Sequence, residues 1–121
     1  MLRSRAAQLT RSATAHVGTI EIDEGSARQP HHTAPGDRLV IRLAESPTSG
    51  YRWQLDEYDS AVLRPAGDEF VPAADATTGG GGTREFRFVV VGTGGSDVVL
   101  SLRRGWETDT PAAQHFRTQI S

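Results

Sequence analysis

The sequence has 121 residues and contains no cysteine, no lysine and no long apolar run. Without cysteine, the chain can form neither a disulfide framework nor a thiolate nucleophile or thiolate metal site. A membrane-spanning helix needs about 18 or more apolar residues in succession, so we expect no membrane insertion. All 13 basic residues are arginine, which we attribute to the coding bias of the source genome.

A basic surface is also lacking. The formal net charge is -2 and the isoelectric point is near 6.0, which argues against nucleic acid as the main partner because binding to phosphates requires a basic face. The length accommodates one domain with at most a short tail. We expect a monomer.

The first residues are basic and contain no acidic side chain. Residues 1–15 include Arg3, Arg5 and Arg11, but no apolar stretch of the length that a secretory signal needs. We predict a flexible basic tail over residues 1–16 and one domain over 17–121, with a cytoplasmic location. The same composition also matches an amphipathic transit peptide, so that alternative stays open.

Apolar and polar residues alternate along much of the chain, as they do in half-buried β-strands. No segment shows the period of a long amphipathic helix. About seven to eight short strands with turns between them predict an all-β, immunoglobulin-like β-sandwich. The expected strands are Val17–Ile22, Arg38–Leu43, Tyr51–Leu55, Arg84–Val91, Asp97–Arg103 and Gln114–Ile120, with weak or edge strands at Ala61–Leu63 and Glu69–Val71.

The chain is organised around the tight turn from Ser46 to Gly50. Pro47 suits the second position of a β-turn, and Gly50 can adopt a positive φ, so the turn should be preformed. Hydroxyl groups of Ser46, Thr48 and Ser49 would stand at its tip, with Tyr51 following. The flanking strands form either a hairpin or a link between two sheets. Such a turn suits presentation to a partner better than it suits chemistry.

Two further segments attract attention. A glycine run, Gly79, Gly80, Gly81 and Gly82 before Thr83, predicts a flexible, exposed loop, because no helix or lysine follows to complete a phosphate cradle. Later, Trp106 follows Arg104 and Gly105 in a polar stretch. This tryptophan either folds back over its own sandwich or anchors an interface, where Trp and Arg are enriched.

Residue types that carry chemistry occur without the spacing of a catalytic or metal site. His31 and His32 are adjacent and point apart on an extended chain, so we interpret them as solvated loop residues. The carboxylates of Asp56, Glu57 and Asp59 most simply solvate a loop, although the sequence leaves a paired-carboxylate site open. We predict no catalytic residue, no metal and no cofactor.

Together, these segments resemble the chagasin-like family of cysteine-peptidase inhibitors. That family carries Asn-Pro-Thr-Thr-Gly before an aromatic residue, then Gly-x-Gly-Gly, then Arg-Pro-Trp. The corresponding residues here are Ser46-Pro47-Thr48-Ser49-Gly50-Tyr51, then Gly79-Gly80-Gly81-Gly82-Thr83, then Arg104-Gly105-Trp106. The resemblance spans roughly Val17 to Ser121. Ser46, Ser49 and Gly105 depart from the family pattern, and the loss of proline at Gly105 should cost about 0.5 to 1 kcal/mol through the freedom of the unbound loop.

The resemblance implies a reversible inhibitor whose three loops enter the active-site cleft of a papain-like cysteine peptidase. Pro47, Thr48 and Ser49 would lie over the catalytic residues of the peptidase. The glycine run would pair through its backbone, and Trp106 would pack beside the cleft with Arg104 orienting it. The three departures keep a second hypothesis open, an immunoglobulin-like module that binds a non-peptidase partner. A small enzyme on this scaffold is a third, which would need a pocket that the sequence does not indicate.

Overall fold

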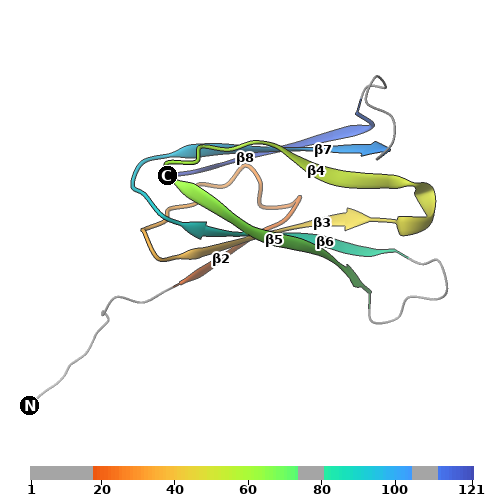
Figure 1. Ribbon diagram of the computed structural model, residues 1–121, viewed down its shortest axis with the longest axis horizontal. Helices are drawn as coiled ribbons and strands as arrows, with labels where there is room; N and C mark the ends of the chain where they lie inside the picture. The colour runs from red at the N-terminus through yellow and green to blue at the C-terminus, as the bar shows by residue number, and fades with distance from the viewer. Residues whose placement is uncertain (1–17, 74–80, 105–111) are drawn as a thin grey trace, which may run out of the picture.

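The alternating segments form two β-sheets that face one another across one apolar core (Figure 1). The computed structural model describes residues 18–73, 81–104 and 112–121. The fold of these residues is the all-β, immunoglobulin-like sandwich that the sequence predicts. The described elements are β2 Thr19–Ile22, β3 Arg38–Glu45, the 3-10 helix η1 Pro47–Ser49, β4 Tyr51–Glu57, β5 Leu63–Pro72, β6 Gly82–Val90, β7 Ser96–Arg104 and β8 Gln114–Ile120.

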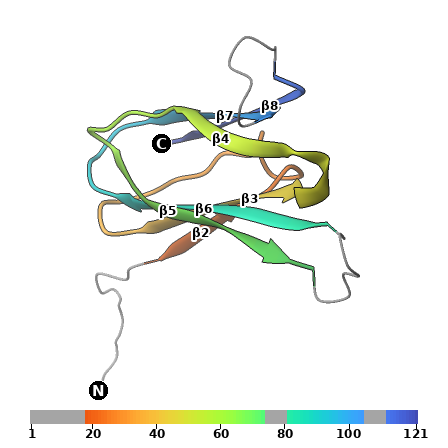
Figure 2. The ribbon, with the colours of Figure 1, turned by 45° about the vertical axis from the view of Figure 1, so that its right-hand side comes forward.

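The strands divide into a four-stranded sheet, ordered β2-β3-β6-β5, and a three-stranded sheet, ordered β4-β7-β8. β2 runs parallel to β3, and the other neighbouring strands are antiparallel. β3 and β4 therefore lie in different sheets, although a short turn joins them. The turn is a link between the sheets and not the loop of a hairpin, as Figure 2 shows where the chain crosses from one layer to the other.

The core lies between the sheets and follows the predicted alternation. Leu39, Ile41 and Leu43 of β3 are fully buried, and each is separated from the next by one residue that points outward. Burying such a side chain contributes about 1.5 to 3 kcal/mol. The buried apolar residues are Ile22, Leu39, Ile41, Leu43, Trp53, Val62, Leu63, Phe86, Phe88, Val90, Val98, Leu100, Phe116 and Ile120.

The structure corrects the prediction of two short strands after β4. Leu63 of the first expected piece and Glu69–Val71, the second, belong to one ten-residue strand, β5, whereas Ala61 and Val62 lie in the turn before it. The register against β6 shifts between Pro65 and Asp68, where Gly67 has φ of 108°. This β-bulge breaks the period-two pattern, so the sequence shows two fragments in place of one strand. The predicted edge position is correct.

A chain of ion pairs crosses the outer face of the four-stranded sheet. Arg42 pairs with Glu21 of β2 and, at 2.9 Å, with Glu85 of β6. Arg87 pairs with Glu85 at 2.9 Å and with Glu69 of β5 at 2.5 Å. Hydrogen bonds to Glu85 and Glu21 raise the pKa of Arg42. Exposed pairs of this kind contribute little stability individually.

No helix in the described ranges is long and apolar enough to cross a bilayer.

Candidate functional site

The turn between β3 and β4 is closed by its own backbone. The N–H of Ser49 donates to the carbonyl of Ser46 at 3.1 Å, and the N–H of Gly50 donates to the carbonyl of Pro47 at 3.3 Å. Pro47 occupies the second turn position, and Gly50 has φ of 80°, a region that favours glycine. Residues 46–49 are exposed. The predicted preformed and accessible turn is present.

The side chain of Ser49 completes this turn. Its hydroxyl donates to the carbonyl of Ser46 at 2.7 Å and accepts from the backbone N–H of Tyr51 at 3.1 Å. Ser49 thus joins the first residue of the turn to the first residue of β4. The hydroxyl of Ser49 therefore shapes the turn, and a serine in place of threonine is sufficient for that role.

The glycine run is more ordered at its end than the sequence predicts. Gly79 and Gly80 lie outside the described residues, whereas Gly82 and Thr83 are the first residues of β6 and pair with both β3 and β5. A Cβ atom at Gly82 would lie 2.4 Å from the carbonyl oxygen of Val71. The prediction of a loop through Thr83 was wrong at these two positions, because close packing and not flexibility requires glycine at 82.

The first residue of the third predicted segment, Arg104, lies next to the end of the turn segment. Arg104 is the last residue of β7 and lies opposite Tyr51, the first residue of β4. The guanidinium carbon of Arg104 lies 5.1 Å from the centre of the Tyr51 ring, a cation–π arrangement. Gly105 and Trp106 lie outside the described residues. The contact nevertheless fixes where the chain leaves β7 relative to the turn.

These segments gather at one end of the sandwich. The register pairs Glu45, just before the turn, with Gly82, and it pairs Tyr51 with Arg104. The end of β3, the start of β4, the start of β6 and the end of β7 therefore lie together, on the right in Figure 1. We call this region the loop end. The structure thus brings together the described parts of all three predicted segments.

Beneath the turn, three polar groups are buried together. The carboxylate of Glu45 accepts from the backbone N–H of Trp53 at 2.9 Å and receives the guanidinium of Arg84 at 2.8 Å. The indole N–H of Trp53 donates to the carbonyl of Ala44 at 2.9 Å. Burial lowers the pKa of Arg84, but hydrogen bonds to Glu45 and Asp68 outweigh that effect, so the pKa is raised overall.

This buried pair is not among the predicted features, although the alternation of inward and outward residues carries a signal for it. Glu45 lies two residues after Leu43 and therefore on the same inward face of β3. Arg84 lies two residues before Phe86 and therefore on the same inward face of β6. Two opposite charges at inward positions of paired strands indicate a buried ion pair.

The other candidate residues hold local structure. His31 bonds through Nε2 to the carbonyl of Ser26 at 2.7 Å, and the exposed His32 bonds through Nδ1 to the hydroxyl of Ser121 at 3.0 Å. His31 is half-buried, so it is less solvated than predicted. Of the three carboxylates predicted in a loop, Asp56 and Glu57 instead belong to β4, whereas Asp59 accepts from the N–H of Ala61 at 2.8 Å and shapes the turn before β5. Within residues 18–73, 81–104 and 112–121, no three His, Asp or Glu side chains are placed to hold a metal.

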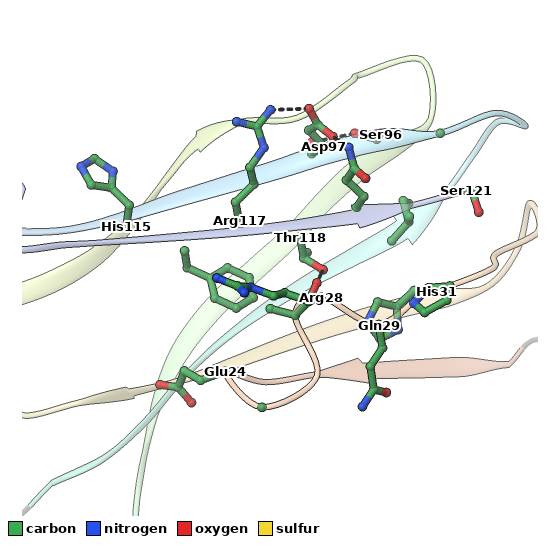
Figure 3. A pocket seen from close by; sticks show the side chains of 17 residues that line it. Glu24, Arg28, Gln29, His31, Ser96, Asp97, His115, Arg117, Thr118 and Ser121 are labelled. Carbon is green, nitrogen blue, oxygen red and sulfur yellow. Dashed lines mark hydrogen bonds and ion pairs between the residues drawn. The ribbon is translucent and has the colours of Figure 1, made fainter.

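A groove runs along β8 and the segment that follows β2 (Figure 3). Its lining includes Glu24, Arg28, Asp97, His115 and Arg117, but none of the predicted site residues. Arg117 is paired with Asp97 at 2.6 Å. The groove is therefore separate from the loop end.

Comparisons with known proteins agree with this architecture. The sequence matches the chagasin family peptidase inhibitor I42 over residues 33–120. No curated protein sequence matches the chain. Among solved structures, the cysteine protease inhibitor EhICP2 from Entamoeba histolytica has a TM-score of 0.76 and 20% identity, covering 87% of this chain and 96% of that one. Amebosin has a TM-score of 0.67 and 26% identity, covering 86% and 96%.

A third structure, PbICP-C in complex with falcipain-2, has a TM-score of 0.57 and 15% identity and covers 88% of this chain and 92% of that one. At such identities the solved structures of EhICP2 and PbICP-C support the fold. The family match extends over most of the sandwich, from the segment before β3 to the end of β8. It confirms the resemblance that the three motifs indicate. The chain belongs to the chagasin family of peptidase inhibitors.

Proposed function

We propose that this protein reversibly inhibits papain-like cysteine peptidases by placing its loop end in their active-site cleft. The observation that carries the proposal is the exposed, internally bonded turn at 46–50, which stands beside the roots of the other two motif segments. The inhibitory function is inferred from membership of the family. The class of peptidase is inferred from the three motifs and their order.

The turn explains how a peptide segment can fill such a cleft without being cut. Cleavage requires a carbonyl carbon held about 3 to 3.5 Å from the nucleophile and in line with it. In the turn, the carbonyls of Ser46 and Pro47 already accept backbone hydrogen bonds, and the chain is curled into a 3-10 turn. A substrate is extended at this point. The turn therefore occupies space without offering the extended backbone that a substrate presents.

The flanking segments would extend the contact. Because Gly82 and Thr83 pair on both sides within the sheet, backbone contact with the peptidase falls to the glycines that precede them. The stacked Tyr51 and Arg104 would hold the root of the third segment, from which Trp106 packs beside the cleft. EhICP2 is described as a cysteine protease inhibitor, and PbICP-C was solved with falcipain-2 bound, which supports the same class of partner here.

The test is a titration of the purified protein against papain and a cathepsin L-like peptidase with a fluorogenic peptide substrate. We expect inhibition below micromolar concentration that is reversed by dilution, with the inhibitor chain recovered uncut. Trypsin, a serine peptidase, serves as the control and should be unaffected. Absence of inhibition at micromolar protein would contradict the proposal and favour a module that binds a non-peptidase partner.

A further inference from the structure

The interior of the sandwich contains one ion pair among the described residues that is buried on both sides. The side chains of Glu45 and Arg84 are only 2% and 8% exposed. Arg84 approaches Glu45 Oε2 through Nη2 at 2.8 Å and through Nε at 3.1 Å, so the contact is a two-pronged one. The inward positions next to the pair on the same strands are Leu43 and Phe86.

Stability alone is a poor explanation for this pair. Removing two charges from water is costly, and replacing a buried ion pair by apolar residues of similar volume is often neutral or stabilising. Two apolar side chains would continue the core formed by Leu43 and Phe86. An ion pair instead fixes the relative orientation of the two side chains, because several hydrogen bonds hold both partners in one geometry.

The bonds of the pair connect four strands at the loop end. Glu45 is the last residue of β3 and accepts from the backbone N–H of Trp53 in β4, across the turn. Arg84, two residues after Gly82 in β6, also donates to Asp68 of β5 at 3.0 Å. The network therefore joins the two strands that flank the turn to the two strands that flank the glycine run.

We propose that Glu45 and Arg84 are positioning residues for peptidase binding, which hold the turn at 46–50 and the start of β6 in one relative placement. The inference rests on the proposed inhibitory function. A binding surface that is arranged before contact loses less freedom on association. If the binding arrangement were populated one-tenth of the time, the apparent inhibition constant would rise about tenfold.

The experiment combines Glu45→Gln with Arg84→Met. The glutamine carbonyl keeps an acceptor for the Trp53 N–H, while the ion pair is removed. We expect a melting temperature within a few degrees of wild type and an inhibition constant against papain that is higher by about tenfold. A double variant that melts like wild type and inhibits like wild type overturns the proposal.

A matched control lies on the same two strands. Arg42→Gln with Glu85→Gln removes an ion pair between β3 and β6 on the outer face. This variant should inhibit like wild type. If it weakened inhibition as much as the inner double variant, the effect would be a general one of cross-strand charge, and the proposal would fail. Should the inner double variant not fold, Arg84→Lys retains the charge without the two-pronged geometry and is expected to weaken inhibition severalfold; unchanged inhibition then overturns the proposal.

A second readout needs no peptidase. Amide hydrogen exchange at Ser49, Gly50 and Tyr51, whose N–H groups close the turn, should accelerate in the inner double variant, while exchange in β8 stays unchanged. If amide exchange in the turn is the same in the inner double variant as in wild type, Glu45 and Arg84 do not position the turn, and the proposal fails even if the wild-type protein inhibits the peptidase. Accelerated exchange in a chain whose wild type inhibits no cysteine peptidase would instead refute the proposed function and leave the structural role of the pair standing.

Discussion

Three atoms of β5 lie where a side chain at position 82 would begin. A Cβ atom there would stand 2.4 Å from the Val71 carbonyl oxygen, 2.7 Å from Phe70 Cζ and 2.8 Å from Pro72 Cα. Two of these atoms belong to the backbone, which cannot turn aside as a flexible side chain can. Glycine at 82 therefore lets β5 and β6 approach closely at the loop end.

Gly82→Ala should lower the free energy of unfolding by about 1 to 3 kcal/mol, because the added methyl group forces the strands apart. Chemical denaturation measures this change. The matched control is Gly81→Ala, where the nearest atom to a Cβ would be the Glu45 carbonyl oxygen at an ordinary 3.7 Å. That change should stay within about 0.5 kcal/mol. Equal losses from both substitutions would contradict the packing explanation.

The hydroxyl of Ser49 offers a test of the turn itself. Ser49→Ala removes the bonds to Ser46 and Tyr51 from an exposed site, so we expect a stability loss of no more than about 1 kcal/mol. Inhibition should weaken severalfold, because the turn then samples other conformations before binding. Ser49→Thr keeps the hydroxyl and should retain the wild-type inhibition constant. If both variants inhibit equally, the hydroxyl has no role in shaping the turn.

At the level of elements, the sequence predicts the strands whose inward positions are apolar and misses what packing decides. β3 and β8 follow a period-two pattern of burial, and β7 follows it from Ser96 to Leu100, after which Ser101 is buried as well. β5 does not, since Pro65 and Gly67 stand at its bulge. The strand character of Gly82 is set by its neighbours on both sides, because glycine has no preference for strands. The alternation also does not show which strands share a sheet.

The pairing of β7 with β8 should depend on pH through Asp97. Arg117 donates to its carboxylate at 2.6 Å and Gln119 at 2.7 Å, and these bonds lower the pKa of Asp97. A group with a lowered pKa in the folded state contributes stability above its unfolded pKa of about 3.9 and loses that contribution as the pH falls through the folded value.

Asp97→Asn should therefore lower the melting temperature at pH 7, and the gap to wild type should close as the pH falls below about 4. Thermal melts at a series of pH values follow this gap. A gap of constant size between pH 7 and pH 3 would show that Asp97 contributes through shape and not through charge.

For the whole molecule, the site arises from topology more than from any single motif. The turn links the two sheets, so it lies at an end of the sandwich, and the registers of β3 with β6 and of β4 with β7 bring the other two segments to that end. The motifs and their order are visible in the sequence, and the resemblance to the family indicates that they bind a peptidase. The sequence pattern alone could not supply the placement, because it depends on which strands pair across long separations.

The extent of the folded unit can be tested by shortening the chain. In the described part of the chain, Gly18 makes the first contacts: its N–H donates to Asp37 Oδ1 at 3.1 Å, and its carbonyl accepts from the N–H of Arg38 at 2.8 Å. Removal of residues 1–16 should therefore leave the melting temperature and the inhibition constant unchanged. Removal of residues 1–22 takes away β2 and its buried Ile22, and it should destabilise the sandwich by about 2 kcal/mol or more. A loss of stability or inhibition in the shorter truncation would mean that the domain begins before residue 17, with the basic segment packing on the sandwich or on the peptidase.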